Sequence, residues 1–425
     1  MPRRRLQLLW IILLIVPLGA ADARDKDERR SDWFTAWGTS QQPNVTPEVI
    51  SNATVRMIAR VTVPGNAIKI RLDNTFSTSP VTIGHAFVGW RVQGARVAAG
   101  SNHAVTFGGS PSVTIPAGGS VTSDPVSIQV LAQQDLAVSL FVSGSNVSPS
   151  KHQSAVVTSY KSADGSGDVA AGETPTAFTG TTTSMWWLKA IDVLSSDTDR
   201  TVVAFGDSIT DGTCSTLDAH DRWEDWVSVR VDLGSSNAGG KSRAEGKRYE
   251  AIVNEGIGGN TVTRDNLQPP PDSIPGVERF DRDVLSHTGV KEVILFEGTN
   301  DIRREASAAQ VIAGMQNIIQ RAHAAGLKIV GVTIIPRHNV PPSGTNTGWN
   351  DAKTAIRNQV NQWIRNEAPF DAVLDFDEVV RDSSNPDLLN PAFNCGDGIH
   401  PSPRGYYEMG KSVDLDVLEL GGRGH

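Results

Sequence analysis

Apolar and polar residues alternate along the first half of the chain, between about residues 33 and 194. Residues 54–63 and 67–74 show this period of two on either side of a Pro-Gly-Asn turn, which predicts a hairpin with one polar face. No segment here has a helical period, so we expect an antiparallel β-sandwich or jelly roll. Further strands are predicted at residues 81–88, 112–115, 126–130, 136–142 and 186–193, with one long Ser- and Gly-rich loop at residues 143–180.

Five tryptophans in this half leave two interpretations open. They could form a platform that stacks on sugar rings, or they could belong to the core of the sandwich. The core is favoured, because large aromatic side chains are mostly buried. The residues are Trp33, Trp37, Trp90, Trp186 and Trp187.

A polar stretch at residues 195–200 separates this half from a second pattern, in which strands alternate with helices. Such alternation predicts a parallel, three-layer α/β sheet that binds ligands at the carboxyl ends of its strands. Loops are expected at residues 234–247, which are rich in glycine, and at residues 337–350. Strands are predicted at residues 201–205, 251–254, 292–296, 328–335 and 372–376, and helices at residues 223–233, 277–285, 306–325, 352–366 and 406–420.

A chain of 425 residues is long enough for two domains. Residues 1–23 combine basic residues, an apolar run and small residues, which is typical of a cleaved secretory signal, with an uncleaved anchor as the alternative. We therefore expect a secreted or periplasmic protein without stable membrane association after cleavage. The predicted parts are a signal peptide at 1–23, a charged tether at 24–32, a β-sandwich domain at 33–196 and an α/β domain at 197–420.

The formal net charge of −8 argues against nucleic acid or an anionic membrane as a partner. The oligomeric state stays open. Two cysteines occur: Cys214 lies six residues after Ser208, and Cys395 lies two residues before Asp397. Export would permit a disulfide between them, and two separate buried thiols are the alternative.

Gly206-Asp207-Ser208 ends the apolar run that opens the second half. A strand followed by a glycine turn can expose a nucleophilic hydroxyl at the end of a sheet. A serine in this position can also be an ordinary turn or helix-cap residue. Ser208 is therefore a candidate nucleophile on local evidence alone.

Two later segments carry candidate donors for an oxyanion. Three glycines within residues 256–259 leave backbone N–H groups uncovered, and the Gly259 N–H is the best candidate, with a flexible turn as the alternative. Asn300 follows the third predicted strand, where its amide could reach the same place or could cap a helix.

Asp397 and His400 lie three residues apart in a glycine-rich turn near the end of the chain. A carboxylate there can hold the imidazole Nδ1–H, so that the other ring nitrogen can take the proton of a serine. Asp301 is a rival for this role, and we expect it to point into the turn that follows it instead.

These blocks together resemble the SGNH (GDSL-type) hydrolase superfamily over residues 200–410. They occur in the expected order: Gly206–Ser208, Ile257–Thr261, Gly298–Asp301 and Asp397–His400. The resemblance implies that Ser208 is the nucleophile, His400 the general base and acid, and Asp397 the residue that orients His400. It also implies an oxyanion hole made by the Ser208 N–H, the Gly259 N–H and the Asn300 side chain, with no metal and no cofactor. Asn260 departs from the pattern, since many relatives have Asp there, but the departure leaves the backbone donor role intact.

The N-terminal half also resembles that of secreted bacterial SGNH proteins, many of which are regarded as carbohydrate esterases. The first hypothesis is therefore a secreted serine esterase that removes acetyl groups from polysaccharide or oligosaccharide through an acyl-serine intermediate. A lipase or arylesterase acting on lipids or small esters is the second. A catalytically dead carbohydrate-binding protein is the third, and the intact set of site residues argues against it.

Overall fold

The computed structural model describes residues 31–43, 45–237, 249–344 and 346–415. The predicted signal peptide, most of the predicted tether and most of the predicted loop at 234–247 lie outside the described residues. The described part belongs to one compact unit that begins at Ser31. Within that part, no helix combines the length and the apolar character that crossing a membrane requires.

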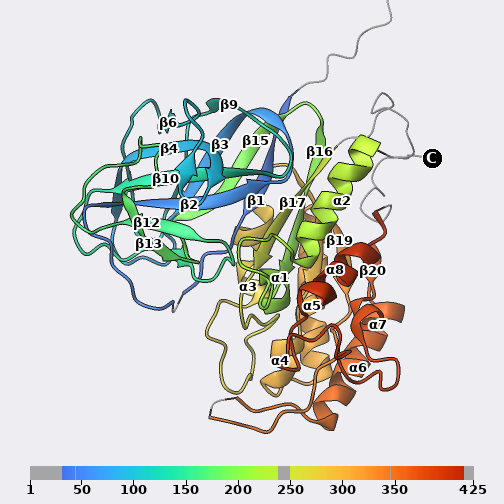
Figure 1. The fold of residues 1–425 in the computed structure, drawn as a ribbon. Helices are drawn as coiled ribbons and strands as arrows, with labels where there is room; N and C mark the ends of the chain where they lie inside the picture. The colour runs from blue at the N-terminus through green and yellow to red at the C-terminus, as the bar shows by residue number, and fades with distance from the viewer. Residues whose placement is uncertain (1–30, 44, 238–248, 345, 416–425) are drawn as a thin grey trace, which may run out of the picture. The chain divides into compact units, whose positions relative to one another are not determined.

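The N-terminal region consists of antiparallel sheets (Figure 1). A five-stranded sheet has the order β1-β15-β3-β8, with β9 also paired to β3, and an eight-stranded sheet has the order β13-β12-β2-β10-β4-β5, with β6 and β7 paired to β4. The prediction of an antiparallel β-rich first half is confirmed. The strands are β1 (Asp32–Gly38), β2 (Ala53–Val61), β3 (Gly65–Asp73), β4 (Val81–Gln93), β5 (Arg96–Val97), β6 (His103–Val105), β7 (Val113–Ile115), β8 (Ser120–Thr122), β9 (Val126–Val130), β10 (Gln134–Val142), β11 (Lys151–His152), β12 (Ser159–Ser162), β13 (Phe178–Thr182), β14 (Met185–Trp186) and β15 (Leu188–Ser195).

The two sheets share one apolar core because their strands alternate buried and exposed side chains. In β9, for example, the valines and the isoleucine are buried while Ser127 and Gln129 are exposed. Trp186 and Trp187 are fully buried, and their indole N–H groups bind Glu48 and Asn74. These two tryptophans therefore belong to the core and not to an exposed sugar platform.

The prediction of a single loop over residues 143–180 is wrong. This segment contains β11 and β12, and β13 begins at its end. β12 pairs with both β2 and β13, and β11 pairs with β14. These strands are two to five residues long and rich in Ser, Thr and Lys, so partners distant in the sequence decide their conformation, and no local pattern reveals them.

The second half contains a five-stranded sheet of order β17-β16-β18-β19-β20 with neighbouring strands parallel. The predicted α/β class of this half is confirmed. Its strands are β16 (Thr198–Gly206), β17 (Tyr249–Gly256), β18 (Val290–Phe296), β19 (Lys328–Val332) and β20 (Ala372–Leu374). Its helices are α1 (Ser208–Asp211), α2 (Trp223–Asn237), α3 (Gly276–Phe280), the π-helix η2 (Asp281–Leu285), α4 (Thr299–Arg303), α5 (Ala308–Ala324), α6 (Asp351–Asn366), α7 (Phe376–Val380) and α8 (Pro403–Ser412).

Helices cover both faces of this sheet, because each central strand is apolar on both sides. Val203 and Phe205 of β16 pack in one cluster with α5 and α6. Val202 and Ala204 of the same strand pack in another cluster with α2 and α8. The continuous apolar run of β16 thus fixes the position of its carboxyl end from two sides.

Several predicted boundaries needed correction. The predicted helix at 277–285 is α3 followed by the π-helix η2, and the predicted strand at 372–376 ends early, because Asp375 caps α7. The last predicted helix, 406–420, instead starts at Pro403 behind the cap Ser402 and ends at Ser412, with residues 416–420 outside the described part. The capping side chains of Asp375 and Ser402 decided two of these ends, whereas the predictions followed hydrophobic periodicity.

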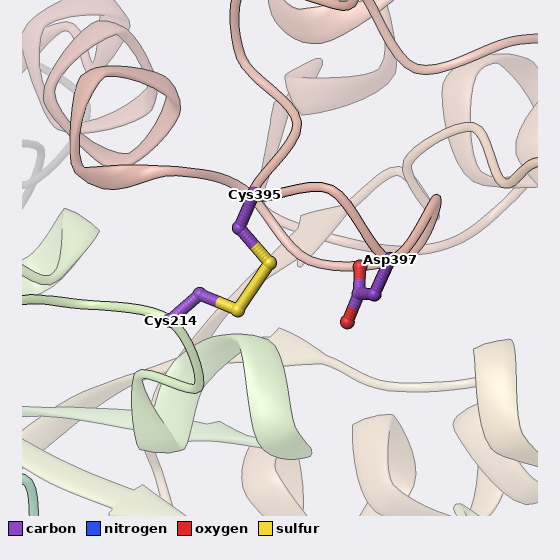
Figure 2. Close-up of side chains that lie close together, drawn as sticks. All are labelled: Cys214, Cys395 and Asp397. Atoms are coloured by element: carbon purple, nitrogen blue, oxygen red, sulfur yellow. A yellow bond between two sulfur atoms is a disulfide. The ribbon is translucent and has the colours of Figure 1, made fainter.

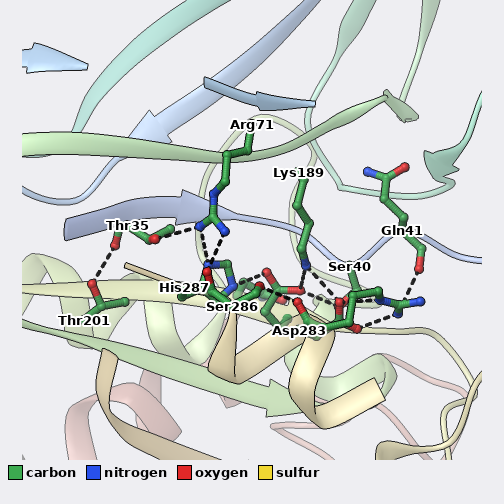
Figure 3. A network of polar contacts seen from close by, with 12 residues as sticks. Thr35, Ser40, Gln41, Arg71, Lys189, Thr201, Asp283, Ser286 and His287 are labelled. Atoms are coloured by element: carbon green, nitrogen blue, oxygen red, sulfur yellow. Dashed lines mark hydrogen bonds and ion pairs between the residues drawn. The ribbon is translucent and has the colours of Figure 1, made fainter. Parts of the chain in front are cut away.

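A buried polar network joins the N-terminal β-strands to the α/β half (Figure 3). Lys189 of β15 lies 2.7 Å from Glu255 of β17 and 2.9 Å from Asp283 of the π-helix. Arg71 of β3 lies 3.1 Å from the Nδ1 atom of His287, whose Nε2 atom is 2.7 Å from Glu255. The attraction between such buried charges is largely offset by the hydration that they lose. Their main effect is therefore to fix how the two halves fit together.

Glu292 near the start of β18 is fully buried, and neither of its carboxylate oxygens has a hydrogen-bond partner in the described part. Burial, reinforced by Glu250, raises the pKa of Glu292 from 4.5 to about 8. Between pH 4.5 and about 8, the folded protein therefore keeps a proton on Glu292 that the unfolded chain has already released. The associated stability is fully present below pH 4.5 and is lost as the pH rises through the folded pKa of about 8.

Replacing Glu292 by glutamine should remove this part of the pH dependence. Between these two pKa values, the free energy of unfolding of the unmodified protein should fall by about 1.4 kcal/mol per pH unit relative to the variant. Urea titrations at a series of pH values measure this difference. Glu367→Gln, at the exposed end of α6, is the matched control. Parallel pH curves for the Glu292 variant and the unmodified protein would contradict the argument.

Candidate active site

Three neighbouring strands end at the same level and place the candidate residues together. Gly206 at the end of β16 pairs with Gly256 of β17 and with Phe296 of β18. Ser208, Gly259 and Asn300 each follow one of these strand ends by a few residues. Parallel strands bring their carboxyl ends to one edge of a sheet, where ligands bind in such folds.

Ser208, His400 and Asp397 form a continuous chain of hydrogen bonds. The Ser208 Oγ atom lies 2.8 Å from the His400 Nε2 atom. The His400 Nδ1 atom lies 2.5 Å from an Asp397 carboxylate oxygen. With Nδ1–H donating to the carboxylate, Nε2 is free to accept the serine proton. The structure thus brings together three of the residues that the sequence singled out.

The Asp397 carboxylate is held by the turn around it. Its other oxygen accepts the backbone N–H groups of Ile399 and His400, at 2.8 and 2.9 Å. Burial alone would raise the pKa of Asp397, but the bonds from His400 and the backbone outweigh it and hold the pKa well below its usual range. Gly398 permits the turn, since its φ is +73° and a Cβ there would lie 2.7 Å from the His338 side chain.

The turn that carries the nucleophile depends on Gly206 and Asp207. A Cβ on Gly206 would lie 2.2 Å from the Thr210 hydroxyl and 2.7 Å from the Phe296 carbonyl, so no larger residue fits. The Asp207 side chain accepts the Ile209 N–H at 2.9 Å and caps α1. Burial raises the pKa of Asp207 to about 6. Ser208 follows as the first residue of the helix, with its own N–H unused by helical bonds.

The three expected oxyanion donors follow the ends of three neighbouring strands. Besides the N–H of Ser208, the N–H of Gly259 is used by no backbone hydrogen bond of the described residues, and the space where a Cβ would sit is open. The Asn300 amide donates one hydrogen to the carbonyl of Asn260, at 3.0 Å. This bond fixes the Asn300 side chain next to Gly259 and leaves its second N–H for a ligand.

Asp301 lies elsewhere. Its carboxylate accepts the N–H groups of Val262 and Thr263, at 2.9 and 3.0 Å, and is fully buried. It therefore points to the loop after β17, not into the turn that follows it as expected. Burial raises the pKa of Asp301 to about 7. Because the His400 imidazole is bonded to Asp397, Asp301 does not orient it. Asp301 instead holds the loop that carries Gly259.

Arg279 in α3 connects the elements beneath the site, and sequence reasoning missed it. The side chain is almost fully buried and lies 3.9 Å from the centre of the Phe205 ring. It donates to the carbonyl oxygens of Gly206 and Glu255, both at 2.8 Å, and to the Asn260 side chain at 2.8 Å. One guanidinium thereby ties the nucleophile strand to the oxyanion loop. The only available signal was an arginine inside the helix predicted at residues 277–285.

A second unpredicted contact reaches the site from the β-rich region. The ring of His152 in β11 lies between the Ser40 carbonyl and Asp211, at 2.8 and 2.9 Å. Both neighbours only accept, so both ring nitrogens donate and the imidazole is protonated. Burial opposes this charge, but Asp211 prevails and the pKa of His152 is raised. The other Asp211 oxygen accepts the Gly258 N–H at 3.0 Å, which holds the oxyanion loop from the N-terminal side.

The two cysteines form the predicted disulfide, which spans 181 residues (Figure 2). Cys214 lies on the loop that follows the nucleophile, and Cys395 lies two residues before Asp397. The side chains of Cys214, Cys395 and Asp397 lie close enough together to suggest a metal site. Because the two sulfurs are bonded to each other, only one carboxylate remains there as a ligand, and this group does not fit a metal ion.

Comparison with known proteins matches residues 204–407 to the GDSL-like lipase/acylhydrolase family. Three solved structures are similar to about half of the chain. A carbohydrate acetylesterase from Sinorhizobium meliloti is 18% identical over 52% of this chain and 99% of its own, with a TM-score of 0.39. An aryl esterase from M. smegmatis is 16% identical over 52% and 99%, with a TM-score of 0.39. A GDSL-like lipase from Bacteroides thetaiotaomicron is 18% identical over 52% and 89%, with a TM-score of 0.34. No curated protein sequence matches the chain.

The assignment to an enzyme class rests on the family match alone, because the similarity to the three solved structures is too weak to support it. The matched segment begins inside β16, two residues before Gly206, and ends inside α8. It includes the nucleophile candidate, the oxyanion loop and the Asp397–His400 turn. Residues 204–407, just under half of the chain, match the GDSL-like lipase/acylhydrolase family, and the protein is a carboxylic ester hydrolase.

Proposed function

We propose that the protein is a secreted serine esterase that removes acetyl groups from polysaccharide or oligosaccharide. The observation that supports the chemistry best is the chain of hydrogen bonds from Ser208 through His400 to Asp397, together with the uncovered N–H of Gly259. This arrangement combines an activated hydroxyl with stabilisation of the charge that develops on an ester carbonyl.

The reaction follows from these positions. The Ser208 Oγ atom attacks the ester carbonyl carbon and passes its proton to the Nε2 atom of His400. The carbonyl oxygen becomes an oxyanion, which the N–H groups of Ser208 and Gly259 and the Asn300 amide stabilise. As the bond to the alcohol breaks, His400 returns the proton to the leaving oxygen and an acyl-serine remains. Water then attacks the acyl carbon, gives a proton to His400, and the acid leaves as the serine regains its hydrogen.

Two features of the chain support the proposed location and substrate. A disulfide next to the site is typical of proteins exposed to an oxidising compartment, as the signal-like residues 1–23 also suggest. The net charge of −8 suits a neutral carbohydrate better than an anionic membrane. A lipase or arylesterase remains the alternative within the same chemistry.

Acetate release tests the substrate class. The purified protein should release acetate from O-acetylated polysaccharides, and in a series of p-nitrophenyl esters kcat/KM should be highest for acetate and fall with acyl length. A preference for long acyl chains, or esterase activity that never includes an acetylated carbohydrate, would favour the lipase or arylesterase alternative.

A further inference from the structure

A cleft of about 480 Å³ lies beside the oxyanion loop and has walls from both halves of the chain. Gly259 and Cys214 line it on the side of the α/β half. Gln42, Gln153 and Thr183 line it on the side of the β-rich region. Its volume is within the range of roughly 300–1,000 Å³ that small-molecule sites occupy. The cleft therefore offers room for a ligand directly next to a proposed oxyanion donor.

Hydrogen bonds hold the wall from the β-rich region in place. The Gln42 side chain accepts the Gln153 N–H at 2.9 Å, and the Gln42 N–H donates to the Lys151 carbonyl at 3.0 Å. The Thr183 carbonyl accepts the Ala155 N–H at 2.9 Å. Gln153 and Ser154 are exposed on this braced segment, and the Gln153 side-chain oxygen accepts the Thr46 N–H, so that its amide NH₂ group is left for a ligand. The wall is therefore a preformed surface that follows β11, whose His152 already holds the oxyanion loop through Asp211.

The chemistry of the lining favours a ligand rich in hydroxyl groups. Amide and hydroxyl side chains line the β-rich side, and Ser273 and the exposed carboxylate of Asp272 lie opposite, with Asp272 held 3.5 Å from Arg304. Such groups donate and accept hydrogen bonds, as sugar hydroxyls do. Val156 and Leu217 add a smaller apolar surface. A two-carbon acetyl group would fill little of this volume and could use few of these polar groups.

We propose that this cleft binds the alcohol part of the ester, a hydroxyl-rich carbohydrate segment, and that the β-rich region thereby determines which acetylated alcohol is hydrolysed. The inference rests on the proposed function and deepens it. It assigns the residues after β11 to substrate selection, whereas cleavage itself uses groups at the ends of the parallel strands.

Blocking the cleft from its exposed β-rich wall tests this assignment. Ser154→Trp places an indole into the cleft from an exposed position, and Ser110→Trp makes the same change at an exposed turn outside the lining. Each protein is assayed on an O-acetylated oligosaccharide and on ethyl acetate, whose small alcohol cannot fill the cleft. The ratio of the two kcat/KM values should fall at least about tenfold in Ser154→Trp, mainly through KM for the oligosaccharide, and should not change in Ser110→Trp.

Gln153→Ala provides a second measurement that adds no bulk. It should lower the same ratio by about threefold to tenfold, which corresponds to the loss of one or two hydrogen bonds from the Gln153 amide NH₂ group to a ligand. An unchanged ratio in both variants would overturn the proposed cleft. If the unmodified protein hydrolyses ethyl acetate but no acetylated carbohydrate, then the proposed function fails instead, and the hydroxyl-rich ligand fails with it.

Discussion

Replacing Ser208 by alanine should lower kcat for ester hydrolysis by about 10⁵–10⁶-fold. The Ser208 hydroxyl is bonded to the His400 Nε2 atom at 2.8 Å, and no acyl-serine can form without it. The residual rate would come from donors that still polarise the carbonyl, as in other serine hydrolases from which the nucleophile has been removed. Initial rates on p-nitrophenyl acetate give this comparison directly.

Ser215→Ala is the matched control for this change. Ser215 lies on the same loop, but its hydroxyl donates to the Gly212 carbonyl at 2.7 Å and does not contact His400. We expect this variant to keep its activity. If Ser208→Ala hydrolyses the ester as fast as the unmodified protein does, then Ser208 is not the nucleophile.

Changing Asp397 to asparagine should lower kcat by about 10⁴-fold, the effect of losing the carboxylate that orients a catalytic histidine. The amide cannot accept the imidazole N–H and stabilise its charge in the same way, so His400 would favour the wrong tautomer. Because the pKa of Asp397 lies well below its usual range, the carboxylate stays ionised across the working pH range. The loss should therefore persist at every pH at which the enzyme is assayed.

Asp301→Asn separates this role from that of the rival carboxylate. Asp301 accepts two backbone N–H groups with its two oxygens, and asparagine offers a single acceptor oxygen. The variant should lose about 1–3 kcal/mol of stability, with a much smaller loss of turnover than Asp397→Asn. Urea unfolding and kcat measured on both variants compare the two effects, and a larger loss of turnover in Asp301→Asn would reverse the assignment.

The elements that could be predicted from the sequence are those whose signal is local and long. β16 and β18 contain apolar runs that are buried on both faces, and α5 carries a clear apolar stripe behind the capping serine Ser307. The strands β11 and β12 carry no such signal, because they are short and depend on partners far along the chain.

The same distinction applies to the site. Ser208 and His400 are 192 residues apart, but each stands in a recognisable block, so their meeting could be expected. His152 and Asp211 meet only because β11 folds against the α/β half, and neither stands in a distinctive local pattern. Arg279 is similar, since its partners come from three separate segments of the chain, at Ser40, at Gly206 and at residues 255–260. Positioning groups of this kind become visible only when the tertiary contacts are known.

The disulfide changes what a partial opening of the molecule can do to the site. Ser208 and His400 lie just outside the 181-residue covalent ring, six residues before Cys214 and five after Cys395. If the last loop and α8 came loose, the connecting chain and the disulfide could let these two residues separate by at most about 46 Å. His400 would then still be present near the serine at an effective concentration of roughly millimolar. After a local opening, His400 should therefore return rapidly to Ser208. The oxidised enzyme should then recover from brief thermal stress as a unimolecular process.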